Sequence, residues 1–118
     1  MELHKISFAT ISVLRNDLAK IMVDEGVDMD LAMVDEIHLS LLSIFTGSFS
    51  LLVNKTNSYS SQLDALIQFG ALATIDKIAI FAPNKMARLS ADFTASIPSS
   101  AKLNIQVFTC RDEALAWL

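Results

Sequence analysis

The pattern of hydrophobic and polar positions predicts two opening strands, then a regular alternation of helices and strands. Ile6–Leu14 is rich in β-branched and aromatic residues, which favours a strand. Residues 15–17, Arg-Asn-Asp, are typical of a turn, and Leu18–Val23 is predicted to pair back as the second strand of a hairpin. Residues 24–26, Asp-Glu-Gly, break that strand.

The first helix is predicted to begin after Asp30, which is a good N-cap residue. Apolar residues at helical spacing give it one apolar face, formed by Leu31, Val34, Ile37, Leu41, Ile44 and Phe45. Gly47 is expected to end the helix. Phe49–Val53 then predicts a strand inside the sheet.

A polar loop over Asn54–Ser61 separates that strand from the second helix. The sequence Ser-Gln-Leu-Asp at 61–64 resembles a capping box and predicts a helix start at Ser61. The apolar face of this helix is expected to consist of Leu63, Leu66, Ile67 and Leu72. Ile78–Ala82 is a continuous apolar run, as expected of a central strand covered on both faces.

The third helix is predicted to start at Pro83-Asn84 and to end before Pro98. Its apolar face is expected to consist of Met86, Leu89, Phe93 and Ile97. Leu103–Phe108 predicts the last strand, and Thr109 with Asp112 repeats the capping pattern. A short terminal helix is then expected to dock through Ala114, Leu115, Trp117 and Leu118.

This order predicts an α/β fold: a mixed, mostly parallel sheet of four to five strands that opens with a β-hairpin and is covered by about four helices. The chain of 118 residues is expected to form one domain over 1–118, since no linker or repeat divides it. That length is sufficient to bury a core without disulfides or metals.

Composition narrows the function classes. The hydrophobic share of 53% is high and suggests that a partner, such as a second copy of the chain, covers some apolar surface. The net charge of −4 argues against nucleic-acid binding. A single cysteine, Cys110, excludes an internal disulfide. The first residues lack a signal-peptide pattern, and Leu39–Asn54 is too short and too polar to span a bilayer, so a cytoplasmic protein is expected.

The segment order and the end of the chain resemble the STAS domain, the fold of bacterial anti-sigma-factor antagonists and of sulfate-transporter tails. More narrowly, the chain looks like the small stand-alone bacterial proteins grouped as STAS-like or Sec14-like domains. Their ending is similar to the strand Ile105–Phe108 and the helix that closes here in Ala114-Leu115-Ala116-Trp117-Leu118. The resemblance covers nearly the whole chain. It implies a non-enzymatic regulatory domain that acts through protein contacts, and with the apolar composition it favours a homodimer.

In the antagonists, a kinase phosphorylates a serine in an Asp-Ser-Ser-Gly-type loop after a strand. The corresponding segment here, 49–61, contains the candidate phospho-acceptors Ser58, Ser60 and Ser61 but lacks that Asp and Gly. A phosphate there would be favoured by the following helix N-terminus. The simpler interpretation is that one or two of these serines only cap the helix.

An alternative function follows from the position of the cations. Lys55, Lys85, Arg88 and Arg111 follow successive predicted strands, so a parallel sheet would place these four of the nine Lys and Arg residues at its carboxyl end. Such a cluster suits a phosphate, a nucleotide or another small anion, and the Sec14-like resemblance adds a lipid. Against this, no glycine-rich loop accompanies the cations, which are also ordinary loop residues.

The sequence contains few candidates for catalytic or metal-binding residues. Cys110 beside Arg111 at a helix start could be a reactive thiolate, but no base or second cysteine accompanies it, and a structural role is the simpler interpretation. His4 and His38 are too far apart in the pattern to suggest a triad or a metal site. The acidic stretch from Asp24 to Glu36 lacks a calcium-loop pattern and reads as a solvated loop and helix start. No catalytic residue, metal or cofactor is therefore assigned.

Overall fold

The computed structural model describes residues 2–96 and 104–118. Their elements, in chain order, are β1 (Glu2–Lys5), β2 (Ala9–Arg15), β3 (Leu18–Val23), β4 (Asp28–Met29), α1 (Leu31–Ile44), β5 (Phe49–Asn54), β6 (Ser60–Ser61), α2 (Leu63–Phe69), β7 (Ile75–Phe81), α3 (Lys85–Ala95), β8 (Asn104–Phe108) and α4 (Arg111–Trp117). Within these residues, six strands form one sheet in the order β1-β2-β3-β5-β7-β8, while β4 and β6 form a separate two-stranded ribbon.

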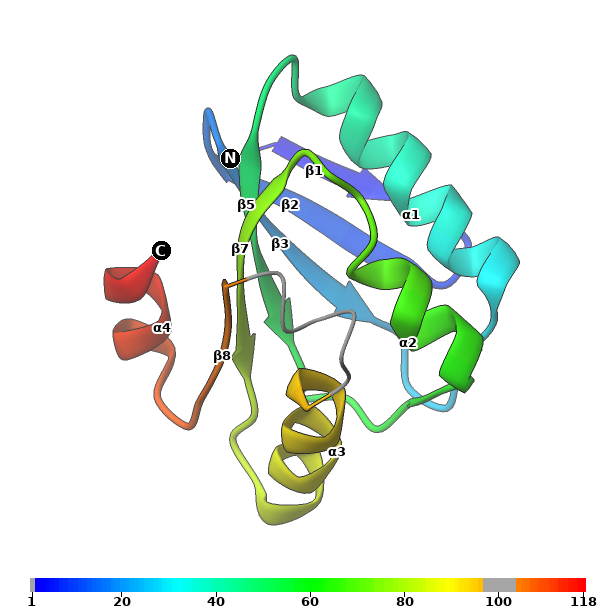
Figure 1. The fold of residues 1–118 in the computed structure, drawn as a ribbon, viewed down its shortest axis with the longest axis vertical. Coiled ribbons are helices and arrows are strands. Elements are labelled where there is room, and N and C mark those ends of the chain that lie inside the picture. The colour runs from blue at the N-terminus through cyan, green and yellow to red at the C-terminus, as the bar shows by residue number, and fades with distance from the viewer. Residues whose placement is uncertain (1, 97–103) are drawn as a thin grey trace.

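The sheet is mixed, as predicted. β1, β2 and β3 are antiparallel neighbours, and β3, β5, β7 and β8 run parallel. Helices α1, α2 and α3 connect the parallel strands on one face of the sheet, and α4 covers the other face (Figure 1). The α/β class and the opening hairpin are thus confirmed. The described sheet has more strands than the four to five expected, because the polar segment of β1 pairs with β2 as an edge strand.

Strand β5 lies at the centre of the core, and all six of its residues are buried. Its side chains alternate between the two faces of the sheet, as in any strand. Leu51 and Val53 belong to the larger apolar core beneath α1, α2 and α3. Leu52 packs with Ala79 and Ala114 in a smaller core beneath α4. The continuous apolar sequence of β5 therefore reflects burial on both faces.

The beginning of α1 was predicted correctly, and its end was not. The Asp30 carboxylate accepts a hydrogen bond from the Met33 N–H at 2.9 Å, so Asp30 is the expected N-cap. The helix ends at Ile44 with Phe45 as its C-cap, and Phe45 stacks on Phe49 with ring centroids 4.8 Å apart. Gly47 lies beyond that cap without a positive φ, so it does not end the helix as glycine usually does.

Two further capping predictions were wrong by one residue. Ser61 is the last residue of β6, and Gln62 is the N-cap of α2, without a side-chain capping bond. Similarly, Cys110 rather than Thr109 is the N-cap of α4. Ser61 is extended because β6 pairs with β4. A capping-box motif depends only on neighbouring residues, so it does not predict this pairing.

The apolar row predicted to bury α3 is exposed instead. Met86, Leu89 and Phe93 are 76%, 56% and 58% exposed, whereas Ala91 is fully buried. Asn84 caps the helix as expected, through a hydrogen bond from the Ala87 N–H at 2.8 Å. The predicted positions of Ile97, Pro98 and Leu103 lie outside the described residues.

The predicted face of α2 is only partly buried. Leu66 and Leu72 are half-buried, but Leu63 and Ile67 are exposed. The helix contributes Ala65 to the core as its only fully buried residue among those described. The fully buried residues described in α2 and α3 are therefore the alanines Ala65 and Ala91.

Candidate functional site: an apolar cavity with one lysine

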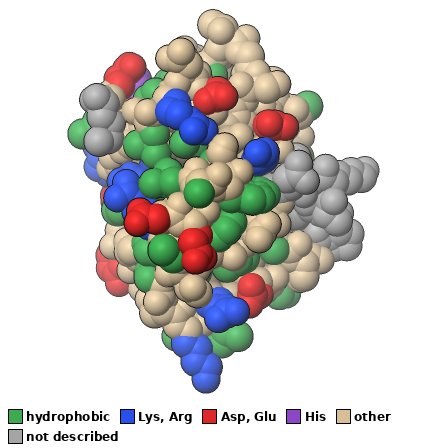
Figure 2. Space-filling view, turned by 90° about the vertical axis from the view of Figure 1, so that its left-hand side faces the viewer, with side chains coloured by type: hydrophobic (Ala, Val, Ile, Leu, Met, Phe, Trp, Pro, Cys, Tyr) green, Lys and Arg blue, Asp and Glu red, His purple; other side chains and the backbone are tan. Residues whose placement is uncertain are grey.

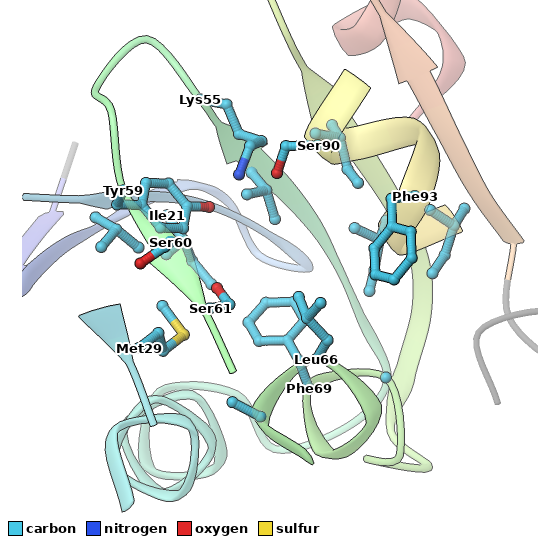
Figure 3. A pocket seen from close by; sticks show the side chains of 17 residues that line it. Ile21, Met29, Lys55, Tyr59, Ser60, Ser61, Leu66, Phe69, Ser90 and Phe93 are labelled. Carbon is cyan, nitrogen blue, oxygen red and sulfur yellow. The ribbon is translucent and has the colours of Figure 1, made fainter. Parts of the chain in front are cut away.

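A cavity of about 260 Å³ lies between α2 and α3, above the carboxyl-terminal parts of β3, β5 and β7 (Figure 3). Its floor is apolar and includes Ile21, Val53 and Ile80 from these three strands. Leu66 and Phe69 of α2 and Phe93 of α3 add apolar walls, which can be followed in Figure 3. The carboxyl end of a parallel sheet is the usual location for a ligand site in α/β proteins.

Lys55 is the only cation among the described residues that line this cavity. It directly follows β5, and its backbone N–H donates a 2.9 Å hydrogen bond to the Phe81 carbonyl oxygen, which extends the pairing of β5 with β7. The residue is only 8% exposed. Its ammonium nitrogen lies 3.9 Å from the centre of the Tyr59 ring, a cation–π contact.

No described carboxylate compensates the charge of Lys55: none lies within the 4.0 Å of an ion pair. Burial lowers the pKa of Lys55 from 10.5 to about 8 because an ammonium ion loses hydration there. Burial also raises the pKa of Tyr59 to about 12, so its hydroxyl remains protonated at neutral pH. The cavity therefore offers one cation and hydroxyl donors at one end of an apolar chamber.

A short ribbon holds Tyr59 and the neighbouring serines at the cavity. In it, Ser60 and Ser61 of β6 pair with Asp28 and Met29 of β4. The Ser60 hydroxyl donates to the Asp28 carboxylate at 2.9 Å, which adds a side-chain bond to the backbone pairing.

Hydrogen bonds between the loop that follows β3 and the loop that follows β5 also hold the segment before β6. Gly26 has a φ of +79°, a conformation that L residues with side chains rarely adopt, and its N–H donates to the Ser58 carbonyl oxygen at 2.7 Å. The Asn57 side-chain amide donates to the Val23 carbonyl oxygen at 3.0 Å. The loops after β3 and β5 are thereby joined above the sheet edge.

Four acidic residues of the stretch have local structural roles. Asp24 pairs with Lys5 at 2.9 Å, and the Glu25 carboxylate accepts the Ser58 N–H. Asp28 binds Ser60, and Asp30 caps α1. These contacts agree with the expected loop and helix start.

The four cations predicted to form an anion site do not all line this cavity. Lys55 lines the cavity, but Lys85 and Arg88 are exposed on α3 and do not. Arg111 is exposed at the start of α4, on the opposite face of the sheet (Figure 1). Only Lys55 of the predicted set therefore belongs to the candidate site.

The candidate phospho-acceptors differ in position. Ser58 and Ser60 are exposed, whereas Ser61 is half-buried and, like Ser60, lines the cavity. The side chain of Ser60 and the backbone of Ser58 are already bonded to carboxylates. A phosphate on Ser60 would therefore meet negative charge.

The remaining candidate residues do not form a second site within the described part of the chain. Cys110 is exposed, and no group of three His, Cys, Asp or Glu side chains is placed to hold a metal ion among residues 2–96 and 104–118. His38 is buried, and its Nε2 lies 3.2 Å from the Phe69 carbonyl oxygen, so it links α1 to α2. Burial lowers the pKa of His38, although the Phe69 hydrogen bond and the Asp35 charge act in the opposite direction.

Sequence reasoning missed the cavity and Tyr59. The alternation of side chains along a strand could have predicted the face on which Lys55 lies, because residues 51, 53 and 55 point to the same face. Leu51 and Val53 face the large core, so Lys55 continues that row beneath the helices.

The chain matches no protein-family model, and no curated protein or solved structure matches it. None of the described helices has the length and apolar character needed to cross a membrane.

Proposed function

We propose that this protein is a binding module for a small amphipathic molecule whose apolar part occupies the cavity between α2 and α3. The observation that carries the proposal is the apolar chamber of about 260 Å³ at the carboxyl end of the parallel strands. Cavities of about 150 Å³ lined by apolar side chains already bind benzene, so this volume accommodates a larger apolar group. The Sec14-like resemblance supports the same class of ligand.

Cavity-filling variants test this proposal. Leu66→Trp adds volume on the α2 wall, whereas Leu63→Trp makes the same change at an exposed position of the same helix. We expect 1-octanol to shift the NMR signals of cavity residues in the unmodified protein and in Leu63→Trp, with weaker binding in Leu66→Trp. Absence of any cavity shift with apolar probes would contradict the proposal.

We propose as a second candidate a non-enzymatic regulatory module that acts through protein contacts, with a homodimer as its assembly. The specific observation is the row of exposed apolar residues on α3, Met86, Leu89 and Phe93. On the face that carries α4, by contrast, Lys, Arg, Asp and Glu side chains are interspersed among the apolar ones (Figure 2). The resemblance to STAS domains supports this candidate, because those domains act through partners.

Light scattering with Leu89→Glu tests the α3 surface. We expect the unmodified chain to dimerise as concentration rises and Leu89→Glu to remain monomeric. Leu39→Glu places the same charge on an exposed leucine of α1 and is expected to dimerise normally. A monomer at all concentrations, or a Leu89→Glu dimer, would contradict this candidate.

We propose that phosphorylation of Ser60 would regulate the protein by changing the pairing of β4 with β6. A phosphate on Ser60 would remove its bond to Asp28 and place two negative groups together, which would loosen β6 from β4. Intact mass of protein isolated from its source would detect the phosphate. We expect Ser60→Glu, but not Ser60→Ala, to increase hydrogen exchange in both strands; equal exchange in the two variants would contradict this control.

A further inference from the structure

The structure points to an acidic ligand: we propose that Lys55 binds the carboxylate of an amphipathic acid whose hydrocarbon part fills the cavity. This inference rests on the proposed ligand-binding function and names the ligand class. It follows from the placement of one uncompensated cation in an otherwise apolar chamber.

The buried charge of Lys55 carries a free-energy cost. An ammonium ion taken out of water is unfavourable unless it is paired, and buried lysines are therefore usually paired. Lys55 is 8% exposed, and its Nζ forms no hydrogen bond or ion pair with a described residue. The Tyr59 ring at 3.9 Å stabilises the cation but leaves its N–H donors available. A ligand anion would supply the missing acceptor.

The polar side chains of the cavity lie near Lys55. Lys55, Tyr59 and Ser61 lie on one side of the cavity, together with the apolar Ile21 and Met29, and the apolar Leu66, Phe69 and Phe93 lie on the other (Figure 3). A ligand with one polar end and one hydrocarbon end fits this arrangement in a single orientation. The protonated Tyr59 hydroxyl is a second donor at the polar end.

The single cation described in the cavity favours a carboxylate over a phosphate. One lysine balances the single charge of a carboxylate, whereas a phosphate monoester carries about two charges at neutral pH. Lys85, Arg88 and Arg111 do not line the cavity and supply no second cation. The acidic head is therefore assigned as a carboxylate, and the cavity volume suits a medium-chain or arylalkyl acid.

Matched probes separate this inference from the proposed function. Octanoate and 1-octanol have hydrocarbon chains of similar length and differ in the head group. Calorimetric titration with both ligands therefore measures the contribution of the head group to the binding affinity. At pH 7 we expect octanoate to bind more tightly than 1-octanol, and Lys55→Met to weaken octanoate at least tenfold while 1-octanol changes less than twofold. Lys85→Met, an exposed lysine outside the cavity, should leave both affinities unchanged.

The pH dependence gives an independent measurement. Tyr59 is the only other titratable side chain among the described residues that line the cavity, and it stays neutral below pH 10. Octanoate affinity should fall as the pH rises above about 8, approaching tenfold per pH unit, because free Lys55 loses its proton there. The affinity for 1-octanol should not follow this profile.

Several results would overturn the inference. Equal affinity for octanoate and 1-octanol, or an unchanged octanoate affinity in Lys55→Met, would remove the role of Lys55 while preserving an apolar ligand site. Tighter binding of octyl phosphate than of octanoate would overturn the carboxylate assignment. Failure of all three probes to bind would instead contradict the proposed ligand-binding function itself.

Discussion

Replacing Lys55 by methionine should stabilise the ligand-free protein. The change keeps an unbranched side chain of similar length and removes the buried charge. Lowering the lysine pKa from 10.5 to about 8 corresponds to about 3 kcal/mol, because each tenfold change in proton affinity is worth about 1.4 kcal/mol. The cation–π contact with Tyr59 offsets about 1 kcal/mol of this cost. We therefore expect Lys55→Met to raise the free energy of unfolding by about 2 kcal/mol at pH 7.

The sign of the pH dependence follows from the two protonation states. Below pH 8, Lys55 is protonated in the folded and the unfolded chain, so the full cost is present. Between about pH 8 and 10.5 the unfolded chain binds more protons than the folded one, so the free energy of unfolding rises with pH. Tyr59 acts in the opposite direction between pH 10 and about 12, because burial raises its pKa. Measurements should therefore remain below pH 10.

Urea unfolding between pH 7 and 9.5 checks this reasoning. The unmodified protein should gain about 2 kcal/mol of stability over that range. Lys55→Met should lose this gain, while the exposed-lysine control Lys85→Met should retain it. A Lys55→Met protein with the same stability and the same pH slope as the unmodified chain would show that Lys55 is solvated, and would also remove the basis for its proposed ligand role.

Three further predictions concern the fold that supports the site. Asp30→Ala should lower the free energy of unfolding by about 1 kcal/mol in urea titrations, because the Met33 N–H loses its acceptor, and no change would contradict the cap. Leu41→Ala should cost about 2–5 kcal/mol by the same assay, since Leu41 is fully buried. Stability should also fall as the pH drops below 6.5, because only the unfolded chain then protonates His38 readily; thermal melts of His38→Gln should lose this component.

The order of elements was predictable because the sheet and its connections impose strong periodicities. Phe49–Val53 is buried on both faces, and its continuous apolar sequence indicates this directly. The ribbon of β4 and β6 was not predictable, because only two residues on each side pair, and neither segment has a strand-like sequence. Edge strand β1 was missed for a related reason: it is mainly exposed and polar.

The buried face of α3 was predicted wrongly, because the large apolar residues at helical spacing are the exposed ones in this helix. Ala91 is fully buried, whereas Met86 and Leu89 are exposed, and Phe93 remains 58% exposed although it also lines the cavity. The candidate site was predictable only in part. Alternation along β5 is sufficient to place Lys55 beneath the helices, but the contribution of Tyr59 depends on the joined loops, whose contacts span more than 30 residues.

Phe93 connects the two proposed functions. Its ring lines the cavity, and it also belongs to the exposed row on α3. A ligand in the cavity would contact this side chain and bias its position, so it would alter the surface offered to a second copy. Because linkage is reciprocal, octanoate should change the dimer dissociation constant by the same factor by which dimerisation changes octanoate affinity. Sedimentation equilibrium with and without octanoate measures this factor; Phe93→Ala should reduce it, and an unchanged dimer constant at saturating octanoate would show that the cavity and the α3 surface act independently.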